Sequence, residues 1–187
     1  MKNIEIPRFK EEKAIAVAAM LLRLSGGSCD KYWLNKLMYY VERQSLVKSG
    51  QPIFFDRLYS VRYGPIVSAV MDGIESSEYP VDNLWARHFS VEGKTVSLRE
   101  DADDSVLSPF EEKLIEEAYN KFKGWTFPKL LSFFHSLPEN KNTTSREVIN
   151  YDEILQAEGF DPETIEKTFE EISYLNYLEN IVNCAPC

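Results

Sequence analysis

Apolar residues recur at helical spacing along most of the chain. Between residues 10 and 24 they stand three or four positions apart, which is the period of an amphipathic helix. A second helix is predicted over residues 30–48, because Asp30 is a good N-cap and Gly50 is a stop signal. The same reasoning predicts five further helices, over residues 65–74, 108–123, 126–135, 149–157 and 161–179.

One segment alternates between apolar and polar residues instead. The runs Phe89–Val91 and Thr95–Leu98 flank Glu92-Gly93, a pattern typical of a β-hairpin. A hairpin of two strands is only marginally stable, so we expect it to pack on the helices or to gain a third strand. The extended stretch Asp56–Val61 is the candidate for that strand.

The chain contains no signal of a division into separate domains. It has no internal repeat, no low-complexity tract and no long linker rich in proline, glycine or serine. A chain of 187 residues is long enough to bury one full core. We therefore predict one mainly α (α+β) domain over residues 1–187, with a small antiparallel β-hairpin or three-stranded sheet inserted. Its core is expected over about residues 10–180, with a frayed tail at 181–187.

The charge is acidic and unevenly distributed. There are 21 basic and 30 acidic side chains, a formal charge of −9; residues 1–100 account for +2 and residues 101–187 for −11. This balance argues against direct nucleic-acid binding, which needs a basic surface. The asymmetry has two interpretations. It reflects solvated, glutamate-rich helix faces, or it steers a basic partner toward the helices at 108–123 and 161–179.

No apolar run approaches the roughly 18 residues of a membrane span. The longest, Ala14–Leu22, is too short, and Glu5, Glu11 and Glu12 stand where a signal peptide would be basic. We therefore expect a cytoplasmic protein without a membrane partner.

Common catalytic motifs are absent from the sequence. It has no GxSxG, HExxH, Walker or GxGxxG pattern. The neighbours Glu116 and Glu117 diverge on a helix, and His135, near a helix end, is suited to a structural role beside the helix dipole. We predict no catalytic residue and no cofactor.

Metal and redox sites have little support. Cys184 and Cys187 form a C-x-x-C pair, Cys29 stands alone, and His88 and His135 are remote from both in sequence. Structural zinc usually needs four ligands, and the acidic run at 101–104 lacks the glycine and the closing glutamate of a calcium loop. We expect reduced thiols on a frayed tail and no metal, with a metal or redox role as the alternative.

The segment from Asn35 to Ile74 carries the most distinctive pattern. A helix face that mixes basic and aromatic residues is followed by the turn Tyr63-Gly64-Pro65. Because glycine permits unusual backbone angles, this turn is either structural or also part of a partner surface. The predicted partner-binding residues are Lys36, Tyr39, Tyr40, Arg43, Arg62, Tyr63, Gly64 and Pro65.

Several short motifs follow one another in a particular order. They are K-L-M-Y-Y at 36–40, G-Q-P-I at 50–53, Y-G-P-I-V at 63–67, L-S-P at 107–109 and G-W-T-F-P-K-L-L-S-F-F-H at 124–135. Together they resemble the Panacea domain, or SocA-like antitoxin domain, over about residues 10–180. The chain departs from that pattern at Phe134, where the family has serine before the histidine. It departs again at Leu137–Asn140, where the family continues with a tryptophan.

The resemblance implies a mainly helical antitoxin that neutralises a cognate toxin by direct protein contact. Such proteins are often encoded by prophages and mobile elements. Some members carry an added DNA-binding or zinc-binding segment, which we do not expect in this chain. Two alternatives remain: a phage or mobile-element adaptor that binds a host protein, and a small enzyme with a pocket lined by Lys36, Arg62 and Tyr63.

Overall fold

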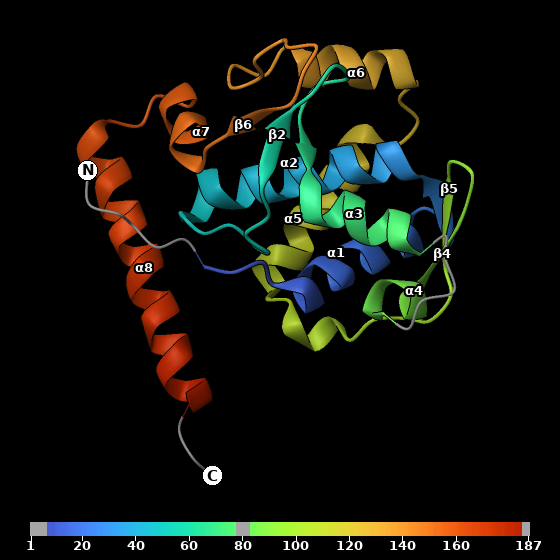
Figure 1. Ribbon diagram of the computed structural model, residues 1–187, viewed down its shortest axis with the longest axis horizontal. Helices are drawn as coiled ribbons and strands as arrows, with labels where there is room; N and C mark the ends of the chain where they lie inside the picture. The colour runs from blue at the N-terminus through green and yellow to red at the C-terminus, as the bar shows by residue number, and fades with distance from the viewer. Residues whose placement is uncertain (1–6, 78–82, 185–187) are drawn as a thin grey trace.

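The computed structural model describes residues 7–77 and 83–184, and within them the fold is mainly α (α+β), as predicted (Figure 1). The helices are α1 (Glu11–Leu24), α2 (Lys31–Ser49), α3 (Ser68–Ser76), α4 (Leu84–His88), the 3-10 turn η1 (Asp104–Val106), α5 (Pro109–Phe122), α6 (Phe127–His135), α7 (Tyr151–Ala157) and α8 (Pro162–Cys184). The strands are β1 (Ser28–Asp30), β2 (Leu58–Ser60), β3 (Ile66–Val67), β4 (Phe89–Glu92), β5 (Thr95–Leu98) and β6 (Glu147–Ile149).

The predicted hairpin is confirmed as β4 and β5, but its third strand is not Asp56–Val61. The observed order is β1-β5-β4, with Cys29 opposite Val96. Strand β1 reaches this position because Gly26 and Gly27, with φ of 82° and 97°, turn the chain back after α1. Leu98 N–H then donates to the carbonyl of Gly27 at 2.9 Å.

Asp56–Val61 instead contains β2, the central strand of a second sheet that the sequence did not predict. Its order is β3-β2-β6, and Leu58 lies opposite both Val67 and Ile149. Two predicted helices consequently begin later than expected, at Ser68 and at Tyr151, because the residues before them are β3 and β6. Strands of two or three residues are too short to show alternation.

The helix ends largely follow the sequence signals. Ser108 and Glu111 form the expected capping box of α5, and the Asp30 carboxylate accepts the N–H groups of Tyr32 and Trp33 at the start of α2. Thr126 occupies the N-cap position of α6 but makes no side-chain cap hydrogen bond. Helix α4 was not predicted. The sequence places Leu84 in a loop, and a helix of five residues shows little periodicity.

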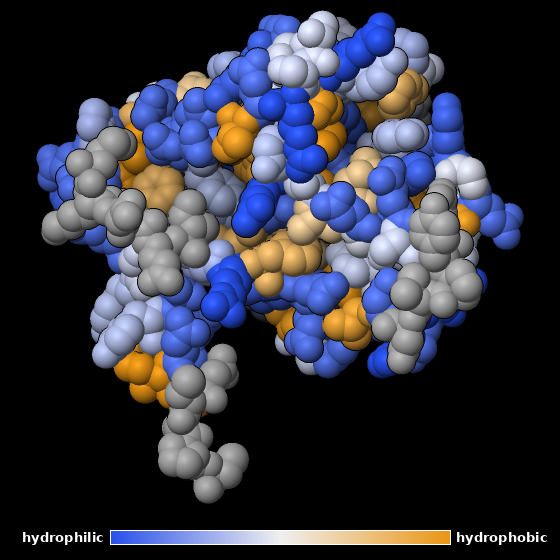
Figure 2. Space-filling model, viewed as in Figure 1, coloured by the Kyte–Doolittle hydropathy of each residue, from blue (hydrophilic) through white to orange (hydrophobic). Residues whose placement is uncertain are grey.

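Helix α8 lies along one side of the body and projects past it (Figure 1). It continues to Cys184, beyond the predicted end at residue 179, so residues 181–184 of the expected frayed tail are helical. Residues 185–187, including Cys187, and the side chain of Cys184 lie outside the described residues. In the space-filling view of Figure 2, the projecting part of α8 carries hydrophobic residues at its surface.

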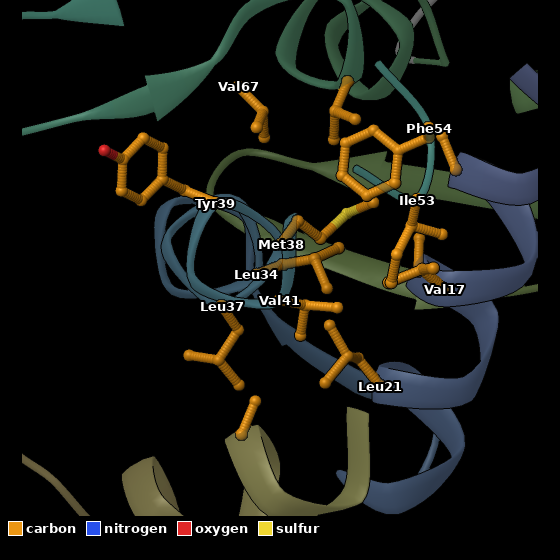
Figure 3. Close-up of a cluster of buried hydrophobic side chains, with 14 of the residues drawn as sticks. Val17, Leu21, Leu34, Leu37, Met38, Tyr39, Val41, Ile53, Phe54 and Val67 are labelled. Atoms are coloured by element: carbon orange, nitrogen blue, oxygen red, sulfur yellow. The ribbon is translucent and has the colours of Figure 1, made fainter. Parts of the chain in front are cut away.

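The core is arranged around α2, which contacts α1, α3, α5, α6 and α7. Figure 3 shows Met38 and Val41 of α2 directed toward α1 and toward Ile53 and Phe54, whereas Tyr39 points away from α1. The buried cluster includes Val17, Leu21, Leu34, Leu37, Met38, Val41, Ile53, Phe54 and Val67. Because helices cover α2 on several sides, polar residues of this helix are also drawn into the interior, and they determine what the predicted partner surface can do.

Candidate functional site

The predicted basic and aromatic face of α2 lies inside the protein. The exposed fractions of Lys36, Tyr39 and Arg43 are 3%, 0% and 3%. Side chains this deeply buried offer no surface to a partner, so the sequence-based assignment has to be corrected for these three residues. Helix α2 is central in the fold, and its outer face is covered by α6, α7 and the loop between α6 and β6.

Lys36 stabilises the Tyr63-Gly64-Pro65 turn. Its Nζ donates to the carbonyl of Pro65 at 2.6 Å and lies 5.7 Å from the centroid of the Phe134 ring. Burial lowers the pKa of Lys36 to about 7. Gly64 has φ of 81°, and a Cβ there would stand 3.4 Å from Cβ of Phe134, so the turn is closely packed.

Arg43 and Tyr39 converge on Glu139, which the sequence places in a polar loop. The Arg43 Nε and the Tyr39 hydroxyl donate to Glu139 Oε1 at 2.6 and 2.9 Å, and Arg43 also reaches Glu158 at 2.6 Å. Burial and the neighbouring Glu139 raise the pKa of Tyr39. Burial alone would lower the pKa of Arg43, but the two glutamates outweigh it and raise that pKa. The network ties α2 to the chain after α6 and to the end of α7.

Glu42 is a further buried ionisable residue of α2. Its carboxylate accepts the backbone N–H groups of Ile53, Phe54 and Asp56 at 2.8, 3.0 and 3.3 Å, and the hydroxyl of Tyr151 at 3.0 Å. Burial raises its pKa to about 7 despite these donors. The three backbone contacts hold the segment between α2 and β2, and the Tyr151 contact ties Glu42 to α7, so Glu42 has a structural role.

Asp56 and Asn35 fix the start of α3 and strand β3. The Asp56 carboxylate accepts the N–H groups of Ala69 and Val70 at 2.8 and 3.0 Å. Burial raises the pKa of Asp56, and these donors oppose the rise. Asn35 exchanges two hydrogen bonds with the backbone of Val67, at 2.8 and 3.2 Å.

Sequence reasoning missed these polar positions, although one signal was present. Glu42 stands four residues from both Met38 and Leu46, so the helical period places it on an apolar stripe. A charged residue on such a stripe indicates a buried, hydrogen-bonded group. Glu139 had no comparable signal, because it lies outside any helical pattern and its partners Tyr39 and Arg43 are about a hundred residues away.

The other predicted partner-binding residues are divided between the surface and the interior. Arg62 and Tyr63 are exposed, with 56% of Tyr63 accessible, and the Arg62 guanidinium lies 5.5 Å from the Tyr63 ring centroid. Tyr40 is half-buried, and its hydroxyl accepts from Lys121 at 2.8 Å. Gly64 and Pro65 are buried. The predicted surface is thus reduced to Arg62, Tyr63 and the edge of Tyr40.

Large apolar side chains are exposed mainly on α8. Six of the eleven exposed large apolar side chains among the described residues lie there: Tyr174, Leu175, Tyr177, Leu178, Ile181 and Val182. Leu175, Leu178 and Val182 face a hollow of about 460 Å³ between α8 and the body. Such a concentration of apolar surface on one element is typical of an interaction site.

A second hollow, of about 420 Å³, is lined by Trp33, Tyr119, Trp125 and Phe127. Cys29 lies at its edge, and burial, together with the charge of Asp30, raises the pKa of Cys29 to about 12. A thiol with this pKa stays protonated at neutral pH and is therefore a poor nucleophile.

Among residues 7–77 and 83–184, no three or more potential metal ligands lie together. His88 Nδ1 lies 3.0 Å from the Glu100 carbonyl, and His135 Nδ1 lies 3.4 Å from Oδ1 of Asn142. Within the same described ranges, every helix is too short or too polar to cross a membrane.

The comparisons with known proteins bear on the central part of the chain. Residues 34–141 match the family model described as Antitoxin SocA-like, Panacea domain. No curated protein and no solved structure matches the chain. The matched interval covers more than half of the 187 residues and contains Lys36, Glu42, Arg43, Asp56 and Glu139, whereas α7 and α8 lie beyond it. The chain therefore belongs to the Antitoxin SocA-like, Panacea domain family.

Proposed function

We propose that the protein is an antitoxin, which neutralises a cognate toxin by binding it directly. The observation that carries this proposal is the family match over residues 34–141. The distribution of apolar surface supports a binding role, because the exposed apolar side chains gather on α8 instead of being scattered.

The buried ionisable groups also favour binding over catalysis. Lys36 and Glu42 have pKa values near 7, a range useful for proton transfer. Both are enclosed, with exposed fractions of 3% and 0%, and both are hydrogen-bonded to the backbone. A substrate at Tyr63 would not reach either group, which speaks against the alternative of a small enzyme there.

Co-expression tests the proposal. The probe is the product of the open reading frame beside this gene, expressed with and without this chain in a bacterial host. We expect the neighbouring product alone to arrest growth, this chain to restore growth, and the two purified proteins to elute together. The control is this chain with a stop codon early in α1. A neighbour that is harmless alone, or that stays toxic beside the intact chain, contradicts the antitoxin role.

A further inference from the structure

Part of the apolar surface in the second half of α8 lies on the side opposite the buried residues of its first half. In the first half, Ile165, Phe169 and Ile172 are buried against the body. At 3.6 residues per turn, a position nine residues further on lies about half a turn around the helix. Tyr174 follows Ile165 by nine residues, and Ile181 follows Ile172 by nine. These two apolar side chains therefore point away from the side that packs on the protein's own core.

Tyr174, Tyr177 and Ile181 form a continuous apolar stripe at positions i, i+3 and i+7. Their exposed fractions are 60%, 61% and 48%. The side of α8 toward the body instead carries Leu178 and Glu179, and Glu179 accepts from Lys10 at 2.8 Å. Within the part of the chain that the structure describes, the apolar stripe is therefore turned away from the protein's own core and is exposed.

The same outer side is acidic nearer the start of the helix. By the helical period, Glu163, Glu166 and Glu170 lie in line with the apolar stripe, and all three are exposed. Helix α8 carries five glutamates against one lysine. We call this surface, made of Glu163, Glu166, Glu170, Tyr174, Tyr177 and Ile181, the outer face of α8.

We propose that the outer face of α8 binds a basic amphipathic helix of the toxin. This inference rests on the proposed antitoxin function and assigns the contact surface to it. Apolar residues of the partner helix pack on Tyr174, Tyr177 and Ile181, and its lysines or arginines meet Glu163, Glu166 and Glu170. Helix α8 lies outside residues 34–141, so this surface is not part of the region that the family model matches.

Charge argues against two other occupants. In a pair of copies with parallel α8 helices, the glutamates of one copy would face those of the other. In an antiparallel pair, the glutamates would be buried against tyrosine and isoleucine, and Lys167, which lies 2.6 Å from Glu163, is the one lysine of α8 to offset their charge. An anionic membrane would likewise repel the acidic half of the face. A basic protein segment satisfies both halves at once.

Binding measurements with matched variants test the proposal. The probe is the neighbouring gene's product, once it has been shown to arrest growth. The double variant Tyr174→Ser with Ile181→Ser is expected to weaken binding of this probe at least about tenfold. A few large apolar side chains usually supply most of the binding energy of such a contact, and the variant removes two of them. Glu163→Gln with Glu166→Gln is expected to slow association and to reduce its dependence on salt.

The matched control is Phe110→Ser with Val148→Ser. These residues are exposed to a similar extent, at 41% and 48%, but belong to α5 and β6. We expect the control to bind like the wild type, and all variants to unfold at similar urea concentrations. If the wild type restores growth and the Tyr174/Ile181 variant binds equally well, the surface assignment is overturned while the antitoxin function stands. If the wild type does not restore growth, the antitoxin function itself fails.

Three further measurements identify the occupant. A photo-crosslinking amino acid in place of Tyr177 is expected to attach to a toxin segment with basic and apolar residues at helical spacing. Attachment to a segment without basic residues overturns the proposal. Sedimentation velocity tests for a dimer: if the wild type is a dimer and the Tyr174/Ile181 variant is a monomer, a second copy occupies the surface and the proposal is overturned. Co-sedimentation with phosphatidylglycerol vesicles tests for a membrane: if the wild type binds the vesicles and the same variant does not, the proposal is also overturned.

Discussion

At the scale of single residues, the interior of this protein is held by charged side chains of α2. Arg43 meets Glu139 and Glu158, Glu42 collects backbone donors, and Lys36 is bonded to the Pro65 carbonyl. A buried ionic group that keeps its partners is tolerated, whereas one that loses a partner is strongly destabilising. The contribution of each group can therefore be measured by removing one partner at a time.

The two glutamates that share Arg43 provide a matched comparison. Glu139→Gln removes the buried partner and is expected to lower the free energy of unfolding by about 2–4 kcal/mol. Glu158→Gln removes the partner that is 36% exposed, and we expect a loss below ~1 kcal/mol. Urea denaturation of both variants measures the difference. Equal losses would show that burial of Glu139 does not determine its contribution.

The lowered pKa of Lys36 predicts that the free energy of unfolding depends on pH. Its pKa is about 7 in the folded state and near 10.5 when the chain is unfolded. Between these values the unfolded state binds more protons, so the Lys36 contribution raises stability as pH increases. The free energy of unfolding of the wild type relative to Lys36→Met is expected to increase from pH 7 to pH 10. A difference that does not change with pH would contradict the burial argument.

At the scale of elements, short segments are fixed by close contacts between neighbours. Helix α3 approaches α4 at Gly73, where an added Cβ would lie 2.4 Å from Cε2 of Trp85. The indole of Trp85 is held in turn, because its Nε1 donates to Glu11 at 2.9 Å. The absence of a side chain at residue 73 is what allows α4 to pack where it does.

Replacing this glycine should reverse the usual effect of glycine in a helix. Gly→Ala inside an exposed helix is typically stabilising by up to about 1 kcal/mol. Gly73→Ala is expected to destabilise the protein by about 1–3 kcal/mol, because Trp85 has to move. Thermal unfolding and tryptophan fluorescence measure this. Asn120→Ala, at an exposed position of α5, serves as the control and should change stability by less than about 0.5 kcal/mol. A Gly73→Ala protein as stable as the wild type would contradict the clash.

At the scale of the whole molecule, charge is separated along the chain. The first hundred residues carry +2 and the remainder −11. The acidic part includes α5, with exposed Glu116 and Glu117, and the outer face of α8. Charge of one sign on part of a surface attracts an oppositely charged partner from a distance and accelerates its association.

Association with the toxin should therefore depend on ionic strength. We expect the association rate constant to fall by about tenfold between low and high salt, with a smaller change in the dissociation rate. Stopped-flow kinetics of the purified pair measures both. Glu112→Gln with Glu116→Gln is expected to reduce the salt dependence if α5 belongs to the steering surface. A rate constant that does not change with salt would contradict steering by the acidic half.

The sequence by itself determined most of the local structure. Helical periodicity and the signals at Asp30, Gly50 and Ser108 located α1, α2 and α5, and alternation located β4 and β5. These features depend on neighbours within a few residues, so a pattern along the chain is sufficient to reveal them. The motif order also pointed to the family that the match over residues 34–141 supports.

Only the tertiary structure decided which residues are surface and which are interior. The Lys36, Tyr39 and Arg43 face has the composition of a binding surface, yet helices and loops distant in sequence cover it. The β3-β2-β6 sheet and the Arg43–Glu139 pair join segments tens of residues apart, and nothing local specifies them. Burial is a property of the assembled chain, and for that reason the outer face of α8 became visible as a candidate surface only in the fold.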